Sequence, residues 1–116
     1  MKIQKIQKIT DLKHNHKGVY LLFGEDRDLI YIGQSINMRA RINTHISDKS
    51  KRQSECNDNE NYYHTKIPRG KVFYYSVLFI EDDNLRNHIE ISLIFMLKPT
   101  LNDIVRIQEN KAKRLN

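Results

Sequence analysis

Cysteine is nearly absent from this chain, and so is any long apolar run. The single cysteine, Cys56, cannot form an internal disulfide, and no cysteine or histidine stands at zinc-site spacing from it. The N-terminal residues carry lysines without the apolar region of a signal peptide, and no stretch approaches the roughly 20 apolar residues that cross a bilayer. These absences exclude a disulfide-rich scaffold and a membrane-spanning protein, and they predict a reduced, cytoplasmic protein.

A second domain has no room in 116 residues, of which 39% are hydrophobic and 29% charged, so we expect one domain over residues 1–116. Lys and Arg number 20 against 14 Asp and Glu, a formal net charge of +6. This excess favours a polyanionic partner such as DNA or RNA, although a soluble surface alone would also account for it. The basic N-terminal arm, residues 1–17, fits a short helix or an extended segment equally well.

A β-hairpin is predicted where residues 19–23 and 29–32, both rich in β-branched and aromatic side chains, flank the turn-forming segment GEDRD. If residues 24–27 form the turn, Tyr20 lies directly opposite Tyr31. Both phenols then leave one face of the sheet about 5 Å apart.

Two glycines interrupt these strands, and glycine weakens a strand. Gly18 and Gly33 each lie near one of the hairpin tyrosines. We interpret them as positions where the backbone approaches a substrate closely or bends sharply.

A helix is predicted next, capped by Ser35 or Asn37 and running to about residue 46. Its apolar stripe comprises Met38, Ile42 and Ile46. Arg41 and His45, four residues apart, lie together along the edge of that stripe.

A polar segment, residues 47–70, predicts a long surface loop that either contacts substrate or is disordered.

Residues 71–80 predict a third, buried strand. Asp82, Asp83 or Asn84 then caps a helix that ends before Pro99. Residues 89–97 are apolar nearly all round, which places this helix inside the fold, and a last short helix to about residue 110 and a basic tail follow.

One charged residue, Glu90, interrupts that apolar segment and needs a partner, because an unpaired buried charge costs several kcal/mol. With two tyrosines, an arginine and a histidine, it completes the groups that a phosphodiester hydrolase uses. The carboxylate can hold one hydrated divalent cation, the arginine can stabilise phosphorane charge, and a tyrosine or histidine can orient or deprotonate water.

Each of these side chains also has a structural explanation. The tyrosines can be a packed cross-strand pair, Arg41 and His45 solvated helix residues, and Asn102 a helix cap. Glu90 can form an ion pair with Arg41.

The segments GVY at 18–20 and YIG at 31–33, followed by Arg41, His45, Glu90 and Asn102, resemble the GIY-YIG nuclease family in order and spacing. The resemblance spans residues 18–102. It implies an α/β (α+β) fold, with a three-stranded antiparallel sheet flanked by helices, and one divalent ion, Mg²⁺ or Mn²⁺.

The resemblance also implies roles, residue by residue. Tyr20 contacts or activates the attacking water and Tyr31 orders the site. Arg41 stabilises the transition state, and His45 matches a position that holds histidine or tyrosine. Glu90 is the metal ligand, while Gly33 and Asn102 support the site.

Two departures from the family pattern stand out. Valine replaces isoleucine in GVY, and Gln34 stands where many relatives have lysine, which leaves the general base open.

The function implied is a DNA endonuclease, with double-stranded DNA the favoured substrate. A non-catalytic nucleic-acid-binding module or an accessory subunit is the alternative, and a homodimer is one assembly that fits. The candidate phosphate contacts are Arg39, Lys49, Lys51, Arg52 and Arg69.

Overall fold

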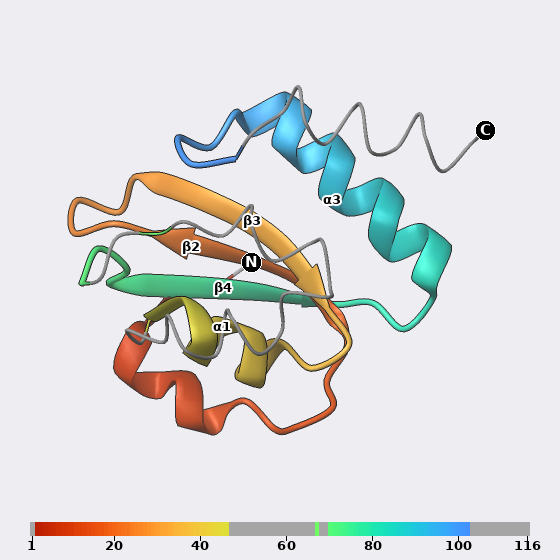
Figure 1. The fold of residues 1–116 in the computed structure, drawn as a ribbon, viewed down its shortest axis with the longest axis horizontal. Helices are drawn as coiled ribbons and strands as arrows, with labels where there is room; N and C mark the ends of the chain where they lie inside the picture. The colour runs from red at the N-terminus through yellow and green to blue at the C-terminus, as the bar shows by residue number, and fades with distance from the viewer. Residues whose placement is uncertain (1, 47–66, 68–69, 103–116) are drawn as a thin grey trace.

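The computed structural model describes residues 2–46, 67 and 70–102, which build an antiparallel sheet with helices on both faces (Figure 1). The strands lie in the order β1-β4-β2-β3, and their bounds are Gln4–Lys5 for β1, Gly18–Phe23 for β2, Leu29–Ser35 for β3 and Tyr74–Phe79 for β4. The helices are the 3₁₀ helix η1 (Ile6–Asp11), α1 (Met38–Ile46) and α3 (Asp83–Leu97). The predicted α+β class is confirmed.

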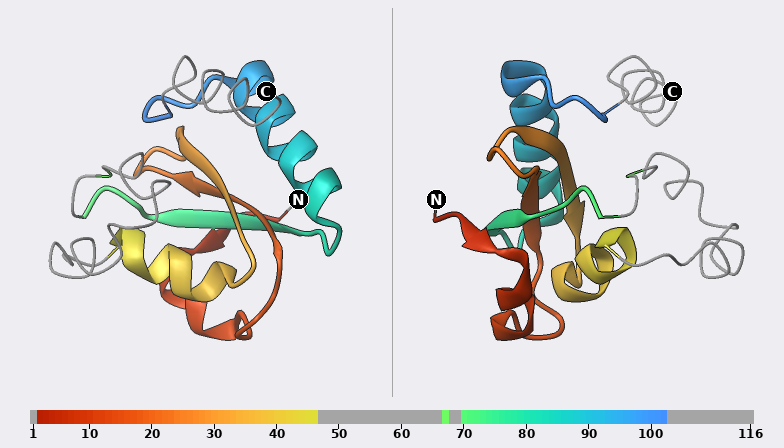
Figure 2. Two further views of the ribbon diagram at one scale, coloured as in Figure 1. Left: turned by 45° about the vertical axis from the view of Figure 1, so that its right-hand side comes forward. Right: turned by 90° about the vertical axis from the view of Figure 1, so that its left-hand side faces the viewer.

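The sheet separates two small hydrophobic cores. On one face, Tyr20 and Leu22 of β2 pack with Met38 of α1 and Ile9 of η1. On the other face, neighbouring residues of β2 and β3 pack against Ile94 of α3. Figure 2 shows α1 and η1 on one side of the sheet and α3 on the other. Because both faces are covered, every residue of β2 is buried and the strand reads as a continuous apolar run.

The N-terminal arm contains both of the conformations that its sequence allowed. Gln4 pairs with Tyr75, which adds β1 to the edge of the three predicted strands, and η1 follows at once. The added strand is two residues long, too short for its sequence to show an alternating pattern.

The hairpin register predicted from the sequence is wrong, although its consequence for the tyrosines holds. Tyr20 pairs with Gly33, and Tyr31 pairs with Leu22. The turn is one residue shorter than expected and comprises residues 25–27, since the Gly24 N–H donates to the Asp28 carbonyl at 2.8 Å. That shift alone would place the two tyrosines on opposite faces.

A β-bulge restores the shared face. The pairing slips by one residue between Leu22 and Phe23, with Ile30 as the extra residue on β3. Ile30 and Tyr31 therefore lie in the same core, although they are neighbours in sequence. The carbonyl of Ile30 accepts instead from the Leu101 N–H at 2.8 Å.

Both predicted helix starts are confirmed. Asn37 caps α1 by accepting the Ala40 N–H on its Oδ1 at 3.2 Å. Asp82 caps α3 by accepting the Leu85 N–H at 2.8 Å. The helix α3 ends at Leu97, and its C-cap Lys98 adopts a left-handed conformation (φ 47°) directly before Pro99, as the proline predicted.

The prediction that α3 lies inside the fold is wrong for the described residues. Only Arg86 and Ile94 of this helix are buried, and Met96 is 74% exposed. The helix covers one face of the sheet, and within residues 2–46, 67 and 70–102 its other side meets solvent.

Three predicted features lie outside the described residues: most of the polar loop, the last short helix and the basic tail. Within the part of the chain that the structure describes, no helix combines the length and apolar character needed to cross a bilayer.

Candidate active site

Three aromatic side chains from three elements meet on the α1 face of the sheet. Tyr20 of β2, Tyr31 of β3 and His45 of α1 are all at most 6% exposed. The phenol oxygen of Tyr20 and Nε2 of His45 are hydrogen bonded at 2.8 Å. The ring centroids lie 6.3 Å apart for the two tyrosines, 5.6 Å for Tyr20 and His45, and 5.0 Å for Tyr31 and His45.

Glycine is required at position 33 by Tyr20 itself. A Cβ added at Gly33, the residue paired with Tyr20, would overlap the phenol ring and its oxygen. A Cβ at Gly18 would overlap the Leu78 carbonyl of β4. The structure therefore gives both glycines a role within the protein: they make room for the Tyr20 ring and for a neighbouring strand.

Burial sets the protonation of this aromatic cluster. It raises the pKa of Tyr20 well above 10, as do Tyr31 and Glu90, whereas the charge and a hydrogen bond of Arg41 lower that pKa. Burial and then Glu90 raise the pKa of Tyr31, again opposed by Arg41. Burial and then Arg41 lower the pKa of His45 from 6.5 to about 3. At neutral pH the site contains two phenols and an uncharged imidazole.

These shifts show that Arg41 of α1 and Glu90 of α3 lie close enough to act on the aromatic cluster. Tyr20, Tyr31, His45 and Arg41 thus meet on the α1 face of the sheet, whereas Glu90 lies beside Gln34 on the α3 face and acts on both tyrosines through its charge. Neither Arg41 nor Glu90 is fully exposed. The Glu90 carboxylate accepts a hydrogen bond from Nε2 of Gln34 at 3.0 Å.

The metal ligands available at Glu90 fit a single, weakly held hard cation. Among the described residues no group of three histidine, cysteine, aspartate or glutamate side chains could enclose an ion. One carboxylate is the protein share typical of Mg²⁺, which keeps several waters and takes other ligands from a phosphate. Glu90 is the residue that would hold such an ion.

Asn102 hydrogen bonds the segment that follows α3 to the outer edge of β3. Its side-chain oxygen accepts the Ile32 N–H at 2.8 Å, and its side-chain nitrogen donates to the Ile32 carbonyl at 2.9 Å. Ile32 lies between Tyr31 and Gly33, so these two bonds hold the strand segment that carries both site residues.

Among the five predicted phosphate contacts, the described residues include Arg39 alone. Its side chain is partly buried, and Nε has no hydrogen-bond partner among the described residues. The other four lie in the 47–66 and 68–69 segments, outside the described part of the chain.

Sequence reasoning missed a polar network beside Glu90. Gln34 was noticed as a departure from the family pattern, but Arg86 and Asn87, its partners on α3, were not singled out. Arg86 lies four residues before Glu90 on a predicted helix, and that spacing places the two on one helix face.

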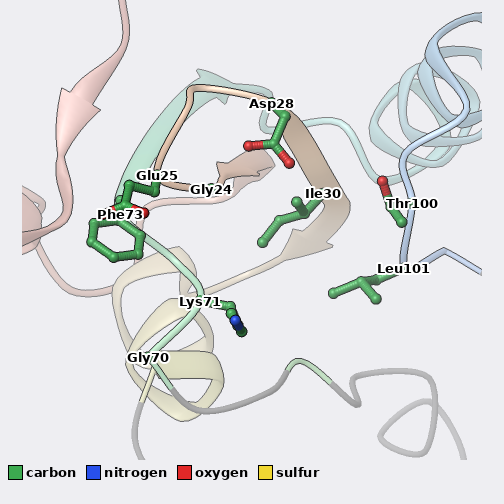
Figure 3. A pocket seen from close by; sticks show the side chains of 9 residues that line it. All are labelled: Gly24, Glu25, Asp28, Ile30, Gly70, Lys71, Phe73, Thr100 and Leu101. Atoms are coloured by element: carbon green, nitrogen blue, oxygen red, sulfur yellow. The ribbon is translucent and has the colours of Figure 1, made fainter.

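A pocket of about 410 Å³ lies at the hairpin end of β3 (Figure 3). Its lining includes Asp28, Ile30, Lys71, Phe73 and Leu101, and none of the predicted catalytic residues. Two of its lining residues, Glu25 and Asp28, are acidic, which disfavours a phosphate.

The fold and site define a small α+β domain with a hydrolytic type of site: a buried tyrosine pair, a histidine, an arginine and one carboxylate. Residues 16–101 match the family model of the GIY-YIG catalytic domain, and the chain belongs to this family. The predicted GIY-YIG nuclease domain is confirmed.

The relatives identified are bacterial. The chain is 31% identical over 105 residues to UvrABC system protein C of Helicobacter pylori (strain G27) and 32% identical to that of strain P12. Each alignment covers 84% of this chain and 16% of the relative, so the chain spans a small part of those proteins.

Among solved structures, the chain resembles the magnesium-bound GIY-YIG N-terminal endonuclease domain of UvrC from Thermotoga maritima. The TM-score is 0.57 at 16% identity, over 84% of this chain and 93% of that one. A tyrosine-to-phenylalanine variant of that domain gives 0.56 at 17% identity, over 89% and 99%. This likeness confirms the fold.

Proposed function

We propose that this domain is a metal-dependent endonuclease that hydrolyses DNA phosphodiester bonds by in-line attack of water. The observation that carries the proposal is the meeting of Tyr20, Tyr31 and His45 on one sheet face, with Arg41 hydrogen bonded to Tyr20 and the charge of Glu90 acting on both tyrosines. The UvrC domain of Thermotoga maritima, described as an endonuclease bound to its catalytic magnesium, supports it.

In this proposal Tyr20 orients the attacking water. Its oxygen accepts a hydrogen bond from Arg41, which can only donate, and is also hydrogen bonded to Nε2 of His45. The phenol has one donor and two acceptor sites, so one of them stays available to a hydrogen bond with water. Because burial and Arg41 disfavour the imidazolium, His45 is uncharged here, and its hydrogen bond holds the phenol of Tyr20 in place.

Arg41 and Glu90 supply the charges. Arg41 lies beside the phenol oxygen and can stabilise negative charge as the phosphorane forms. Glu90 would hold the divalent ion, Mg²⁺ or Mn²⁺, which when bound supplies Lewis-acid stabilisation and lowers the pKa of a coordinated water. Asn102 keeps β3, and with it Tyr31, in place.

DNA is the substrate that we favour, in double-stranded form. The formal net charge of +6 suits a polyanion, and Arg39, whose Nε has no hydrogen-bond partner among the described residues, is a candidate phosphate donor. A cytoplasmic location and a homodimer remain predictions.

The test is metal-dependent nicking of supercoiled plasmid, compared with linear, branched and single-stranded substrates. Tyr20→Phe and Glu90→Gln should each lower the rate by at least about 10²-fold. Matched controls are Tyr74→Phe, which packs with the core on the opposite face of the sheet, and Glu81→Gln, an 84% exposed carboxylate.

Unchanged cutting by both site variants would end the active-site assignment. Salt-sensitive binding of DNA without cleavage, with either metal, would support instead the non-catalytic binding module.

A further inference from the structure

Gln34 connects β3 to the first turns of α3, directly beside the proposed metal ligand. It follows Gly33 in sequence and shares a sheet face with Ile32, the face that α3 covers. Its amide nitrogen donates to Glu90 Oε1 at 3.0 Å and also donates to the Asn87 side-chain oxygen.

The orientation of this amide is set by Arg86. Nε of Arg86 lies 3.1 Å from Oε1 of Gln34, and a guanidinium nitrogen can only donate. The Gln34 oxygen must therefore face Arg86, which leaves its NH₂ group to face Glu90 and Asn87. In the opposite orientation two donors would meet, as would two oxygens.

Arg86 is itself held rigidly. It is 5% exposed, and its Nη1 donates to the carbonyls of Ile80 and Glu81 at 3.1 and 3.2 Å. Its Nη2 lies 2.6 Å from Asp83 Oδ1. The guanidinium thus joins the end of β4, the first turn of α3 and Gln34, so it cannot turn without breaking several bonds.

We propose that Arg86 and Gln34 are positioning residues that hold the Glu90 carboxylate for metal binding, Arg86 acting through the orientation of the Gln34 amide. This inference rests on the proposed function. A hydrogen bond from a neutral amide fixes one carboxylate oxygen without adding a positive charge beside a cation site. The charge of Arg86 is offset at Asp83, and outer partners of this kind typically change metal affinity 10- to 100-fold.

The experiment measures Mn²⁺ binding to the metal-free protein by electron paramagnetic resonance, alongside urea unfolding and cleavage as a function of Mg²⁺ concentration. Gln34→Met keeps side-chain length and removes both hydrogen-bonding functions. We expect about 10-fold weaker Mn²⁺ binding, with most of the maximal cleavage rate recovered at saturating metal. His88→Ala, at an exposed position of α3, should bind Mn²⁺ like the wild type.

Arg86→Lys tests the same series of hydrogen bonds, from Arg86 through Gln34 to Glu90, by changing its first member. This variant also tests the proposal if Gln34→Met fails to fold. Lysine keeps the charge but lacks the planar fork that orients the amide. On its own it should weaken Mn²⁺ binding severalfold. In the Gln34→Met background it should change affinity by less than about twofold, because Arg86 acts through Gln34.

Two results would overturn the positioning role while leaving the metal site intact: wild-type Mn²⁺ affinity in Gln34→Met, or a full additional loss from Arg86→Lys in the double variant. If Glu90→Gln binds Mn²⁺ as well as the wild type does, the metal site of the proposed function fails, and the positioning role fails with it.

Discussion

Acidification should destabilise this protein through one buried imidazole. His45 is 5% exposed, and burial and Arg41 lower its pKa from 6.5 to about 3. The unfolded chain therefore binds a proton near pH 6.5 that the folded chain does not bind until about pH 3. Because the unfolded state holds more protons between these values, stability falls as the pH drops through this window and is fully present above it.

The magnitude follows from the two pKa values. Each unit of difference is worth about 1.4 kcal/mol, so the full contribution of His45 is at most about 5 kcal/mol and is lost only near pH 3. Between pH 7 and pH 5 the loss should be about 2 kcal/mol. Asp83, whose pKa is lowered from 3.8 by its hydrogen bond with Arg86, loses its contribution only at more acidic pH.

The assay is urea unfolding followed by circular dichroism at several pH values, because urea is uncharged and the chain has no tryptophan. His45→Gln can keep a hydrogen bond to Tyr20 but cannot titrate. Its stability should be lower at pH 7 yet should change less between pH 7 and pH 5 than that of the wild type. His14→Gln, which removes an exposed imidazole, is the matched control.

Equal pH dependence in the wild type and His45→Gln would refute the reasoning. It would mean that His45 is accessible to protons in the folded state and that its contact with Tyr20 does not persist in solution.

Three further substitutions test the structural contacts by urea unfolding. Gly33→Ala should cost about 1–3 kcal/mol, because its Cβ overlaps the Tyr20 ring, and Tyr20→Phe in the same background should recover only part of this loss. Asn102→Ala should cost about 1–3 kcal/mol, since both backbone groups of Ile32 lose their partner. Asp82→Ala should cost about 1 kcal/mol through loss of the α3 cap. Stabilities within 0.3 kcal/mol of the wild type, roughly the error of additivity, would contradict each account.

The elements that depend on local chemistry were predictable from the sequence. Asn37 and Asp82 cap the helices because a side-chain oxygen close in sequence accepts a free backbone N–H. Pro99 ends α3 because of its own ring. The identity and order of the tyrosines, the histidine and the glutamate likewise pointed to the family and to the site.

The hairpin register was not predictable in the same way. The turn and the bulge each shift the pairing by one residue, and the sequence does not show the bulge because the Ile30 carbonyl bonds to Leu101, a residue distant in sequence. The two shifts add to two residues, and side chains along a strand return to the same face every two residues. The shared face of Tyr20 and Tyr31 was therefore predicted correctly from an incorrect pairing.

The sequence by itself determined which residues could be reactive and which secondary structures would carry them, because capping, strand propensity and side-chain chemistry are properties of short segments. Tertiary structure alone decided the protonation of His45, the requirement for glycine beside Tyr20 and the Arg86–Gln34–Glu90 network. Burial and hydrogen bonding depend on which side chains meet across elements, and those partners lie 13 to 56 residues apart.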